Sequence, residues 1–520
     1  MSGGFVWDDG DYVTENPTLR TLDGLQENWT ATHENYQYYP LALTTFWIEY
    51  HLWGLNPVGY HILNVLLHGS NALLVWVLLR RLEVRGAWLG AAIFGLHPVH
   101  VESVAWITER KNVLSLFFYL LAALSYLQFV SLERSNEPAD AGTPSPAKGR
   151  LGPAQRGAAG HAGWLYYCLS LGLFTGALLS KTVTLTLPAA MLLVIYWKRG
   201  RIRARDVVQL APFFAVGLGL GLVTAWVETH QMRAQGQYWS LTVLERCLIA
   251  GRALWFYAGK LVAPVNLTFF YPRWEVSTAV WWQFLYPTAA LAAVGGLWVS
   301  RKRLGRGPLV AVLFFAGTLT PALGFFNVYP MRYSFVADHF QYHASIGLIA
   351  LGAAALASVF ALCDRRLPRA GVALGGALII VLGVQTWEQG KTYKDLETLC
   401  QRTLARNPSA WVAESLLAEL RENDGRYEEA LAHDRRALEL NPNDPDLKNN
   451  VGTTLAQLGR YEEAVAVFKS VLAQHPDLAA THGWLAMALH SLGRDEEAEE
   501  HLRLAKEAER SQRNGKGLGR

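Results

Sequence analysis

Charged residues are scarce in this chain, and they are unevenly placed. Asp, Glu, Lys and Arg make up 17% of the 520 residues, whereas a soluble domain carries about 25%. The deficit falls in the first three quarters, where long apolar runs alternate with short basic clusters. The net charge of +4 is too small to indicate nucleic-acid binding. The composition is that of a chain largely embedded in a membrane.

Several motifs of soluble enzymes are missing as well. The sequence has no GxGxxG fingerprint, no P-loop and no serine-nucleophile motif, which excludes the common soluble nucleotide-binding and hydrolase classes. Its four cysteines are scattered without a CxxC pair, so we expect packing residues rather than a disulfide framework or a metal site. Residues 1–40 contain no apolar core, so we expect no cleavable signal peptide.

Ten apolar runs approach the roughly 20 residues that a helix needs to cross a bilayer. They are 59–80, 86–104, 111–130, 163–180, 182–198, 208–227, 279–299, 308–326, 344–363 and 369–387. Basic clusters follow the first, fifth, seventh and ninth runs, and the positive-inside rule places them in the cytoplasm. Both chain ends then lie outside. An outside N-terminus without a signal leads us to expect one further span upstream of Met1.

Two segments between these runs do not read as spans. Residues 241–262 are apolar but carry four charged side chains, so we expect an interfacial helix on the outer leaflet. Residues 131–162 are rich in Pro, Gly, Ala and Ser and lack an apolar pattern, which predicts a disordered cytoplasmic loop.

The C-terminal part of the chain repeats itself every 34 residues. Three amino-acid types keep this spacing: Pro408, Pro442 and Pro476; Gly425, Gly459 and Gly493; Ala430, Ala464 and Ala498. This period, with small residues at the helix crossing, is the tetratricopeptide signature. It predicts helix pairs over 409–442, 443–476 and 477–510, a joining helix over 391–406 and a disordered tail over 511–520. The predicted fold class is therefore all-α: a polytopic transmembrane bundle followed by a tetratricopeptide α-solenoid.

An acidic pair, Asp8-Asp9, opens the chain within an aromatic-rich segment, residues 1–58, that we interpret as a long external loop. A solvated acidic turn or a helix cap would also explain two adjacent aspartates. Long loops beside a membrane are more often functional than incidental. We therefore take Asp8 and Asp9 as candidate catalytic carboxylates.

A second polar cluster interrupts the apolar pattern at residues 97–111. His97, His100 and Glu102 are followed at once by Arg110 and Lys111. Ionisable groups at membrane depth are costly and usually face a polar cavity or one another. One interpretation is an ion pair, either Glu102–Arg110 or Glu109–Lys111, that only ends two helices. The other places a carboxylate and two cations where a phosphate headgroup could bind.

Later charged residues fall at the same predicted outer surface. Lys181 joins two apolar runs, and Arg332, Asp338 and His339 lie in another short external loop. Snorkelling or interfacial anchoring would explain them, and contacts with a phosphate or sugar are the functional alternative. His61 and His68, with Asn64 between them, are interpreted as a polar helix-packing stripe rather than a metal site.

With these residues in view, the chain resembles the transmembrane-and-tetratricopeptide O-mannosyltransferase-like family, which has the GT-C glycosyltransferase fold. The motifs that carry the resemblance are Phe5–Asp9 with Asn16-Pro17, Tyr39–Leu41, Gly59–His61 with Asn64–His68, Leu96–Glu102, Ser180–Thr182 and Asp338–Tyr342. The repeats stand in the expected place. Two features depart from the family: it has a span before the acidic pair, and its animal members read Glu-Arg at Asp338-His339.

The resemblance implies an inverting transfer of a sugar, mannose in this family, from a polyprenyl or dolichyl phosphate to a protein hydroxyl. Asp8 or Asp9 would be the general base, and Glu102 would orient the acceptor or raise the pKa of the base. Four cations would stabilise the leaving phosphate: Arg110, Lys111, Lys181 and Arg332. Substrate contacts would come from His97, His100, Asp338 and His339. No metal ligands are assigned, although the aspartate pair could hold Mg²⁺ or Mn²⁺ with the donor phosphate.

Two other functions fit the same sequence. The first is a membrane scaffold without enzymatic activity that recruits proteins through its repeats. The second is a transferase with a glycan or lipid acceptor. The acidic pair and cations on one face of the membrane favour an enzyme, and the peptide-sized groove of the repeats favours a protein acceptor. We expect an integral membrane protein, with the repeats in the periplasm of a bacterium, or in the endoplasmic reticulum lumen if the source is eukaryotic.

Overall fold

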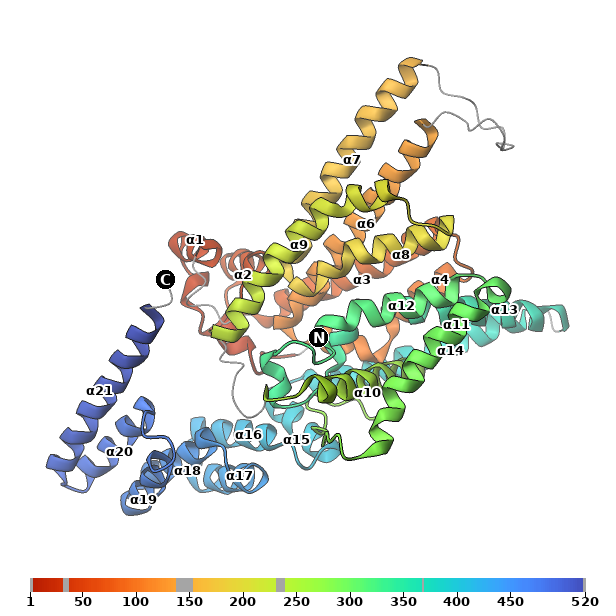
Figure 1. The fold of residues 1–520 in the computed structure, drawn as a ribbon. Coiled ribbons are helices and arrows are strands. Elements are labelled where there is room, and N and C mark those ends of the chain that lie inside the picture. The colour runs from red at the N-terminus through yellow and green to blue at the C-terminus, as the bar shows by residue number, and fades with distance from the viewer. Residues whose placement is uncertain (1–2, 31–36, 137–152, 231–238, 367–368, 518–520) are drawn as a thin grey trace. The chain divides into compact units, whose positions relative to one another are not determined.

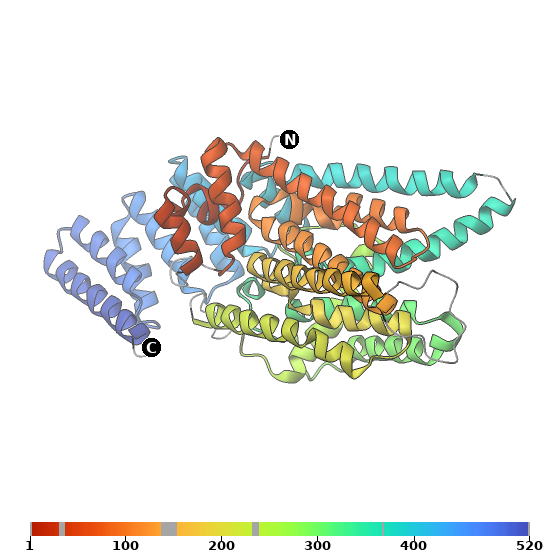
Figure 2. The same cartoon turned by 90° about the horizontal axis from the view of Figure 1, so that it is seen from above.

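The computed structural model describes residues 3–30, 37–136, 153–230, 239–366 and 369–517, and every regular element within these ranges is a helix (Figures 1 and 2). The chain forms two compact units, Met1–Phe269 with Arg273–Asp395, and Phe270–Pro272 with Leu396–Arg520. The first unit contains the apolar helices and the second the repeats. This confirms the predicted all-α class, with membrane helices followed by a repeat region.

The described residues of the first unit form fourteen α-helices. They are α1 (Leu22–Thr30), α2 (Pro40–Trp53), α3 (Pro57–Arg81), α4 (Ala87–Leu96), α5 (Val101–Ala105), α6 (Arg110–Asn136), α7 (Pro153–Ser180), α8 (Leu187–Arg199), α9 (Ala204–His230), α10 (Val243–Val262), α11 (Leu285–Leu304), α12 (Gly307–Leu319), α13 (Ser345–Arg366) and α14 (Ala370–Gly390). Short helical turns connect them. Those used below are η1 (Gly10–Thr14), η3 (Pro98–His100), η4 (Ile107–Glu109), η5 (Thr182–Thr186), η7 (Trp281–Phe284), η9 (Tyr329–Arg332) and η10 (Asp338–Gln341).

Six helices of the described residues are long and apolar enough to cross a membrane. They are Pro57–Arg81, Ile107–Ser131, Ala162–Ser180, Ala204–Thr229, Ser345–Arg365 and Ala370–Tyr393. Two shorter apolar helices, Ala87–Leu96 and Gly307–Ala322, accompany them. The multi-pass membrane fold is therefore confirmed: six of the ten expected spans correspond to these helices, and the other four stay predictions.

Three of the four other expected spans are interrupted by local sequence. The run 86–104 breaks after Leu96, because Pro98 holds His97 in an extended conformation and the chain restarts as η3 and α5. The run 182–198 begins as the threonine-rich turn η5, which leaves α8 with only 13 residues. The run 279–299 begins as η7, and α11 then includes the basic cluster that was expected to follow it.

Three segments expected to lack regular structure are partly or largely helical. Residues 1–58 contain α1 and α2, and α2 packs through Leu43 and Phe46 against buried Val13 of η1 and Leu19. The expected loop 131–162 is shorter at both ends because α6 continues to Asn136 and α7 begins at Pro153; residues 137–152 lie outside the described residues. The first part of the expected tail 511–520 continues α21 as helix, to Gly517.

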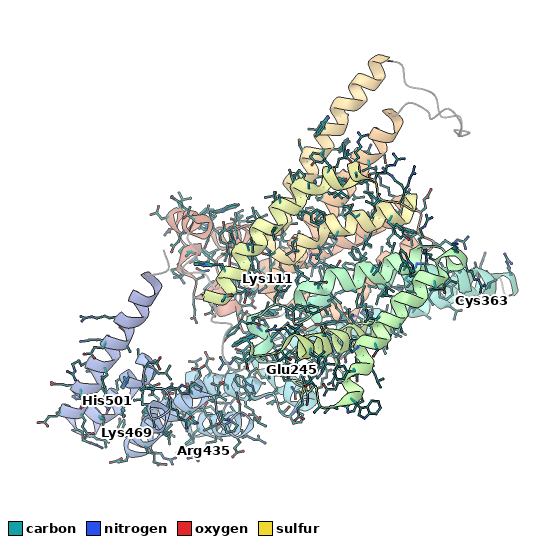
Figure 3. All side chains as sticks on the ribbon, viewed as in Figure 1. Lys111, Glu245, Cys363, Arg435, Lys469 and His501 are labelled. Carbon is teal, nitrogen blue, oxygen red and sulfur yellow. The ribbon has the colours of Figure 1, made fainter. Side chains whose placement is uncertain are left out.

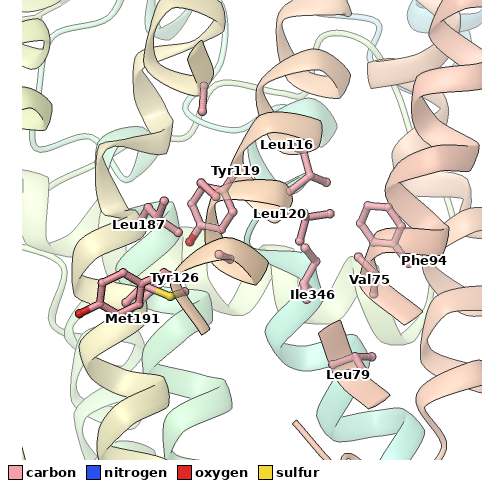
Figure 4. Close-up of a cluster of buried hydrophobic side chains, with 14 of the residues drawn as sticks. Val75, Leu79, Phe94, Leu116, Tyr119, Leu120, Tyr126, Leu187, Met191 and Ile346 are labelled. Carbon is pink, nitrogen blue, oxygen red and sulfur yellow. The ribbon is translucent and has the colours of Figure 1, made fainter. Parts of the chain in front are cut away.

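The core of the first unit lies between α3, α4, α6, α7, α8, α9 and α13. Figure 4 shows Leu116, Tyr119 and Leu120 of α6 at the centre of this cluster, with Val75 and Leu79 of α3 on one side and Met191 of α8 on the other. Each of these side chains is less than a tenth exposed. Close packing on α6 fixes the position of its first turn, where the candidate site residues lie. Helix α10 is amphipathic and is not among the candidate spans; its expected interfacial position stays a prediction.

The second unit contains α15 (Leu396–Arg406) and three helix pairs: α16 (Trp411–Asn423) with α17 (Tyr427–Leu440), α18 (Pro445–Gln457) with α19 (Tyr461–Leu472), and α20 (Ala479–Ser491) with α21 (Asp495–Gly517). The repeated glycines explain the sharp turn within each pair. Gly425, Gly459 and Gly493 have φ of +74°, +74° and +72°, which residues with a side chain rarely adopt. The repeated alanines are buried where the two helices of a pair cross.

Candidate active site

Asp9 ties the start of the chain to the segment before α6. Its carboxylate is completely buried; Oδ2 accepts the Val6 N–H at 2.8 Å, and Oδ1 accepts the Thr108 N–H at 2.8 Å and the Thr108 hydroxyl. Burial raises the pKa of Asp9 to about 7, although these hydrogen bonds lower it. Both oxygens are therefore occupied by the protein itself.

Asp8 has the opposite environment. It is half-buried, and its carboxylate accepts no hydrogen bond from the residues that the structure describes. Burial raises the pKa of Asp8 to about 6, the charge of Lys111 lowers it, and the charges of Asp11 and Glu109 raise it. Glu102, expected from the sequence to repel the base, is not among these causes. A carboxylate with this pKa is ionised at pH 7 and accepts a proton readily.

Trp7 fixes the backbone just before Asp8. Its φ of +44° lies in the left-handed region, where a residue with a side chain is strained. The Trp7 ring stacks on Trp106 with a centroid distance of 5.6 Å and contacts Phe269 and Tyr333 edge-on at 5.2 and 5.7 Å. These ring contacts hold the strained conformation, so the direction of the Asp8 side chain is set by packing.

Lys111 and Lys181 meet on one buried carboxylate, Glu109. Lys111 Nζ lies 3.2 Å from Glu109 Oε1, and Lys181 Nζ lies 3.0 Å from Glu109 Oε2. Lys111 is at the N-terminal end of α6 (Figure 3), where its ammonium group also lies over the rings of Tyr12 and Trp106 at 5.2 and 5.7 Å. Burial lowers the pKa of Lys181 to about 8. The structure thus brings together two of the four predicted phosphate-binding cations.

Arg110 points away from this pair. It is fully buried and binds both oxygens of Glu49, at 2.6 and 3.0 Å. Its remaining donors go to Asn64, Thr45 and the carbonyl of Tyr60. Because the whole guanidinium group is occupied inside the protein, the geometry does not support the predicted role of Arg110 in binding a phosphate.

Glu102 and His339 form a buried pair instead of facing the aspartates. Glu102 Oε1 lies 2.5 Å from His339 Nδ1, and His339 Nε2 lies 4.0 Å from Glu109 Oε1. Burial lowers the pKa of His339 to about 3, whereas burial and the charge of Asp338 raise that of Glu102 well above its usual range. These directions favour a neutral pair in which protonated Glu102 donates to His339. Asp338 is buried beside it in η10.

His97 and His100 are structural in this geometry. His97 accepts the Val99 N–H with Nδ1 and contacts the carbonyl of Leu261 with Nε2 at 3.0 Å. His100 contacts the carbonyl of Phe94 at 2.7 Å and the hydroxyl of Ser345 at 3.0 Å. Because all four ring nitrogens have protein partners, the predicted substrate contacts of His97 and His100 are not supported.

Among the described residues, the remaining predicted residues make no ion pair with the two lysines, although Tyr333, next to Arg332, contacts Trp7. Arg332 is half-buried at the end of η9, in the loop after α12. His61, Asn64 and His68 are spaced along α3, and each bonds to another segment: to the carbonyls of Gly3 and Val104 and to the hydroxyl of Tyr342. This is the helix-packing stripe expected from the sequence.

The most important residue that sequence reasoning did not assign to the site is Glu109. Its only signal is its position next to Arg110 and Lys111, which a helix-ending ion pair explains equally well. Tyr12 and Trp106 gave no signal beyond the aromatic richness of their segments. Tyr12 meets Lys111 across about a hundred residues and Trp106 meets it across five, and one sequence reveals neither contact.

The aspartate pair does not fit a divalent cation. Among the described residues, no group of three or more His, Cys, Asp or Glu side chains could hold a metal ion. Asp9 has both oxygens on N–H and O–H donors, so only Asp8 has oxygens that could bind a cation, and Lys111 already places a positive charge beside it. The Mg²⁺ or Mn²⁺ that the aspartate pair could hold therefore has no part in the mechanism proposed for these residues.

The known proteins compared with this chain match either part of it or most of its length. Two family profiles, both described as tetratricopeptide repeat, match residues 409–477 and 455–518. Protein O-mannosyl-transferase TMTC4 of Mus musculus is 33% identical over 153 residues, covering 24% of this chain and 20% of that protein. A solved structure titled "MamA MSR-1 C2" is 25% identical and covers 27% of this chain and 77% of that one, with a TM-score of 0.21.

One similarity extends along most of the sequence. Protein O-mannosyl-transferase TMTC1 of Homo sapiens is 25% identical over 514 residues, which cover 87% of this chain. The chain spans only 54% of the length of that human protein. The matches to the repeats and along the whole chain confirm the resemblance to the transmembrane-and-tetratricopeptide O-mannosyltransferase-like family.

Proposed function

We propose that this protein is a membrane glycosyltransferase that moves mannose from a polyprenyl or dolichyl phosphate to a serine or threonine hydroxyl of a protein, with inversion at the anomeric carbon. The observation that carries the proposal is Asp8, a half-buried carboxylate with a pKa of about 6 that lies within the electrostatic reach of Lys111. The similarity to proteins named O-mannosyl-transferases supports the same reaction class.

Asp8 is the general base in this mechanism. The acceptor hydroxyl gives its proton to the Asp8 carboxylate while its oxygen forms a bond to the anomeric carbon of the sugar. The bond from that carbon to the phosphate oxygen breaks, and polyprenyl phosphate leaves with the electron pair. A well-placed base of suitable pKa contributes roughly 10²–10⁴-fold to such a rate. Asp9 is not the base in this mechanism, because both of its oxygens already accept hydrogen bonds from Val6 and Thr108.

Lys111 and Lys181 stabilise the leaving phosphate. Their two ammonium groups share one carboxylate, Glu109, and Asp8 loses its negative charge as it takes the acceptor proton, so the site becomes more positive as the phosphate leaves. Fixed cations aimed at developing negative charge are worth more in a buried site than in water. The donor phosphate is therefore drawn to the side of Asp8 on which Lys111 lies.

The repeats supply the acceptor in this proposal. Stacked tetratricopeptide helix pairs form a concave surface that holds extended peptides, and the chain carries three such pairs. A membrane scaffold would use the repeats alone and would not depend on Asp8. The proposed topology places the repeats on the outer side of the membrane, in the periplasm if the source is bacterial and in the endoplasmic reticulum lumen if it is eukaryotic.

A transfer assay tests the proposal. Membranes that contain the full chain are incubated with radiolabelled polyprenyl-phosphate mannose and an extract of acceptor proteins, beside the Asp8→Asn/Asp9→Asn double variant and a Glu15→Gln control at an exposed position. We expect label in protein for the wild type and the control and none for the double variant. Equal labelling in all three would refute the mechanism. Label found only in lipid or in free glycan would show that the acceptor is not a protein.

A further inference from the structure

Glu109 is the point at which two distant segments meet. Lys111 follows it in the first turn of α6, whereas Lys181 stands 72 positions later, between α7 and η5. Each carboxylate oxygen of Glu109 has one ammonium group, at 3.2 and 3.0 Å. The side-chain amide of Asn112 also donates to Glu109, so the orientation of the carboxylate is fixed from a third direction.

We propose that Glu109 is a positioning residue for the donor phosphate, because it holds Lys111 and Lys181 together so that both ammonium groups bind the same phosphate. This inference rests on the proposed function, since it concerns the lipid-linked phosphate of that reaction. It assigns Glu109 no contact with the reacting atoms.

The charge balance of the cluster favours an additional anion. Two buried lysines share one carboxylate, and their side chains are only 8% and 14% exposed. Asp8 and Glu228 also act on Lys111 through their charge, but no direct ion pair joins them to it among the described residues, so the ammonium groups can take a second directly bound anion. A phosphate group is such an anion and accepts hydrogen bonds from both lysines.

The hydrogen-bond balance leads to the same conclusion. An ammonium group has three N–H donors. Among the described residues, Glu109 is the acceptor that the structure gives to Lys111 and to Lys181. Each lysine therefore retains donors that can point to an oxygen outside the protein.

The neighbouring ion pair provides a structural contrast. Arg110 and Glu49 are also buried, but they match one positive charge with one negative charge, and every donor of Arg110 is used. That pair has no capacity for a ligand. Two consecutive residues, Arg110 and Lys111, thus have different partners and different roles.

The charges around Lys181 make the proposal testable by pH. Burial lowers the pKa of Lys181 to about 8, and the negative charge of Glu109 is the largest influence that opposes this shift. The other titratable groups that act on Lys181 or are acted on by it are Lys111, Glu102, His339 and His343. If the charge of Glu109 is removed, Lys181 should lose its proton at a lower pH and should cease to attract phosphate there.

Binding of geranyl phosphate, a short polyprenyl phosphate without a sugar, tests this directly. The purified full chain in detergent is titrated with the labelled compound between pH 6 and 9, beside two Glu109 variants. Glu109→Gln keeps the shape and removes the charge; we expect roughly tenfold weaker binding at pH 7 and loss of binding at a lower pH than in the wild type. Glu109→Asp keeps the charge on a shorter side chain; we expect weaker binding with an unchanged pH limit.

A matched control separates positioning from stability. Asp206 is another buried carboxylate, paired with Arg199 at 2.6 Å at the other end of α8, so Asp206→Asn removes a buried ion pair away from the lysines. We expect this variant to bind geranyl phosphate as the wild type does. If both Glu109 variants lower the unfolding temperature but keep the wild-type affinity and pH limit, the proposal is overturned.

Two further comparisons identify the ligand and separate this inference from the proposed function. Binding of geranyl phosphate at least tenfold tighter than inorganic phosphate supports a lipid-linked phosphate, and equal affinities overturn that assignment. A wild-type chain that binds geranyl phosphate through Glu109 but transfers no mannose would refute the transferase and retain the phosphate site. A wild-type chain that binds neither compound would refute the phosphate site itself.

Discussion

The Oδ1 atom of Asp9 accepts the backbone N–H of Thr108 at 2.8 Å, across 99 positions of the sequence. This bond joins the first ordered segment to the turn before α6. Asp8 precedes Asp9, and Lys111 follows Thr108 by three residues, so the bonded pair brings the proposed base and the proposed phosphate-binding lysine to the same place. Asp9 therefore anchors the segment to Thr108, and Asp8 is the proposed base.

Loss of the hydrogen bonds to the Asp9 carboxylate should lower the stability of the protein. In Asp9→Asn, an NH₂ group replaces one carboxylate oxygen. It cannot accept the hydrogen bond that the N–H of Val6 or of Thr108 donates to Asp9 in the wild type. We expect a loss of about 1–3 kcal/mol and a lower unfolding temperature in detergent. Glu15→Gln, at an exposed position in the same segment, should leave the temperature unchanged. An Asp9→Asn variant as stable as the wild type would show that the anchor is not needed.

The rate of transfer should have a maximum between about pH 6 and pH 8. Below pH 6, Asp8 takes up a proton and no longer acts as a base, because its pKa is raised to about 6. Above pH 8, Lys181 loses its proton, because its pKa is lowered to about 8. Initial rates in Lys181→Arg should fall less on the alkaline side, since arginine stays charged. An alkaline limb that does not move in Lys181→Arg would assign it to another group.

The two neighbouring cations of α6 should respond differently to the same substitution. Arg110→Met leaves Glu49 buried without its partner, which costs about 3–5 kcal/mol, and should lower the yield and unfolding temperature. Lys111→Met should be folded and should raise the KM for the donor. The unfolding temperature and the donor KM of both variants check this. A raised donor KM in folded Arg110→Met would contradict this and support a role for Arg110 in binding the phosphate.

The repeats contain a buried carboxyl group that should make them less stable as the pH rises. Asp434 is 1% exposed and accepts the Thr454 hydroxyl at 2.6 Å, and burial raises its pKa from about 4 to about 7. Its contribution to stability is therefore complete below pH 4 and is lost as the pH rises through 7. Asp434→Asn should protect the amides of α17 and α18 by about 1–3 kcal/mol at pH 8 and not at pH 4. Hydrogen exchange on the full chain, corrected for intrinsic rates, measures this; weaker protection of the variant at pH 8 would contradict it.

The fold was predictable where the sequence carries a period. The 34-residue repeat locates α16 to α21 because glycine, alanine and proline must recur where the backbone turns and the helices cross. The six candidate spans were predictable from the length of their apolar runs. Apolar length did not predict the breaks within two of the other expected spans, because length alone does not register Pro98, which ends α4, or the β-branched threonines of η5, which shorten α8.

The site was predictable in its residue types and less so in their partners. Asp8, Lys111 and Lys181 stand out as charges between apolar runs, and the structure brings Lys111 close enough to act on both other groups. Sequence reasoning could not tell Arg110 from Lys111, because their separation depends on Glu49, which lies 61 positions away. It also could not tell Asp8 from Asp9, because only the contact with Thr108 distinguishes them.

The most direct test of the central claim compares Asp8→Asn with the wild type in a single assay. The initial rate of mannose transfer from polyprenyl-phosphate mannose to protein is measured at pH 7 with equal amounts of folded chain. We predict that Asp8→Asn keeps the unfolding temperature and the donor KM of the wild type and loses roughly 10²–10⁴-fold in rate. A folded Asp8→Asn chain that transfers mannose at the wild-type rate would contradict the account.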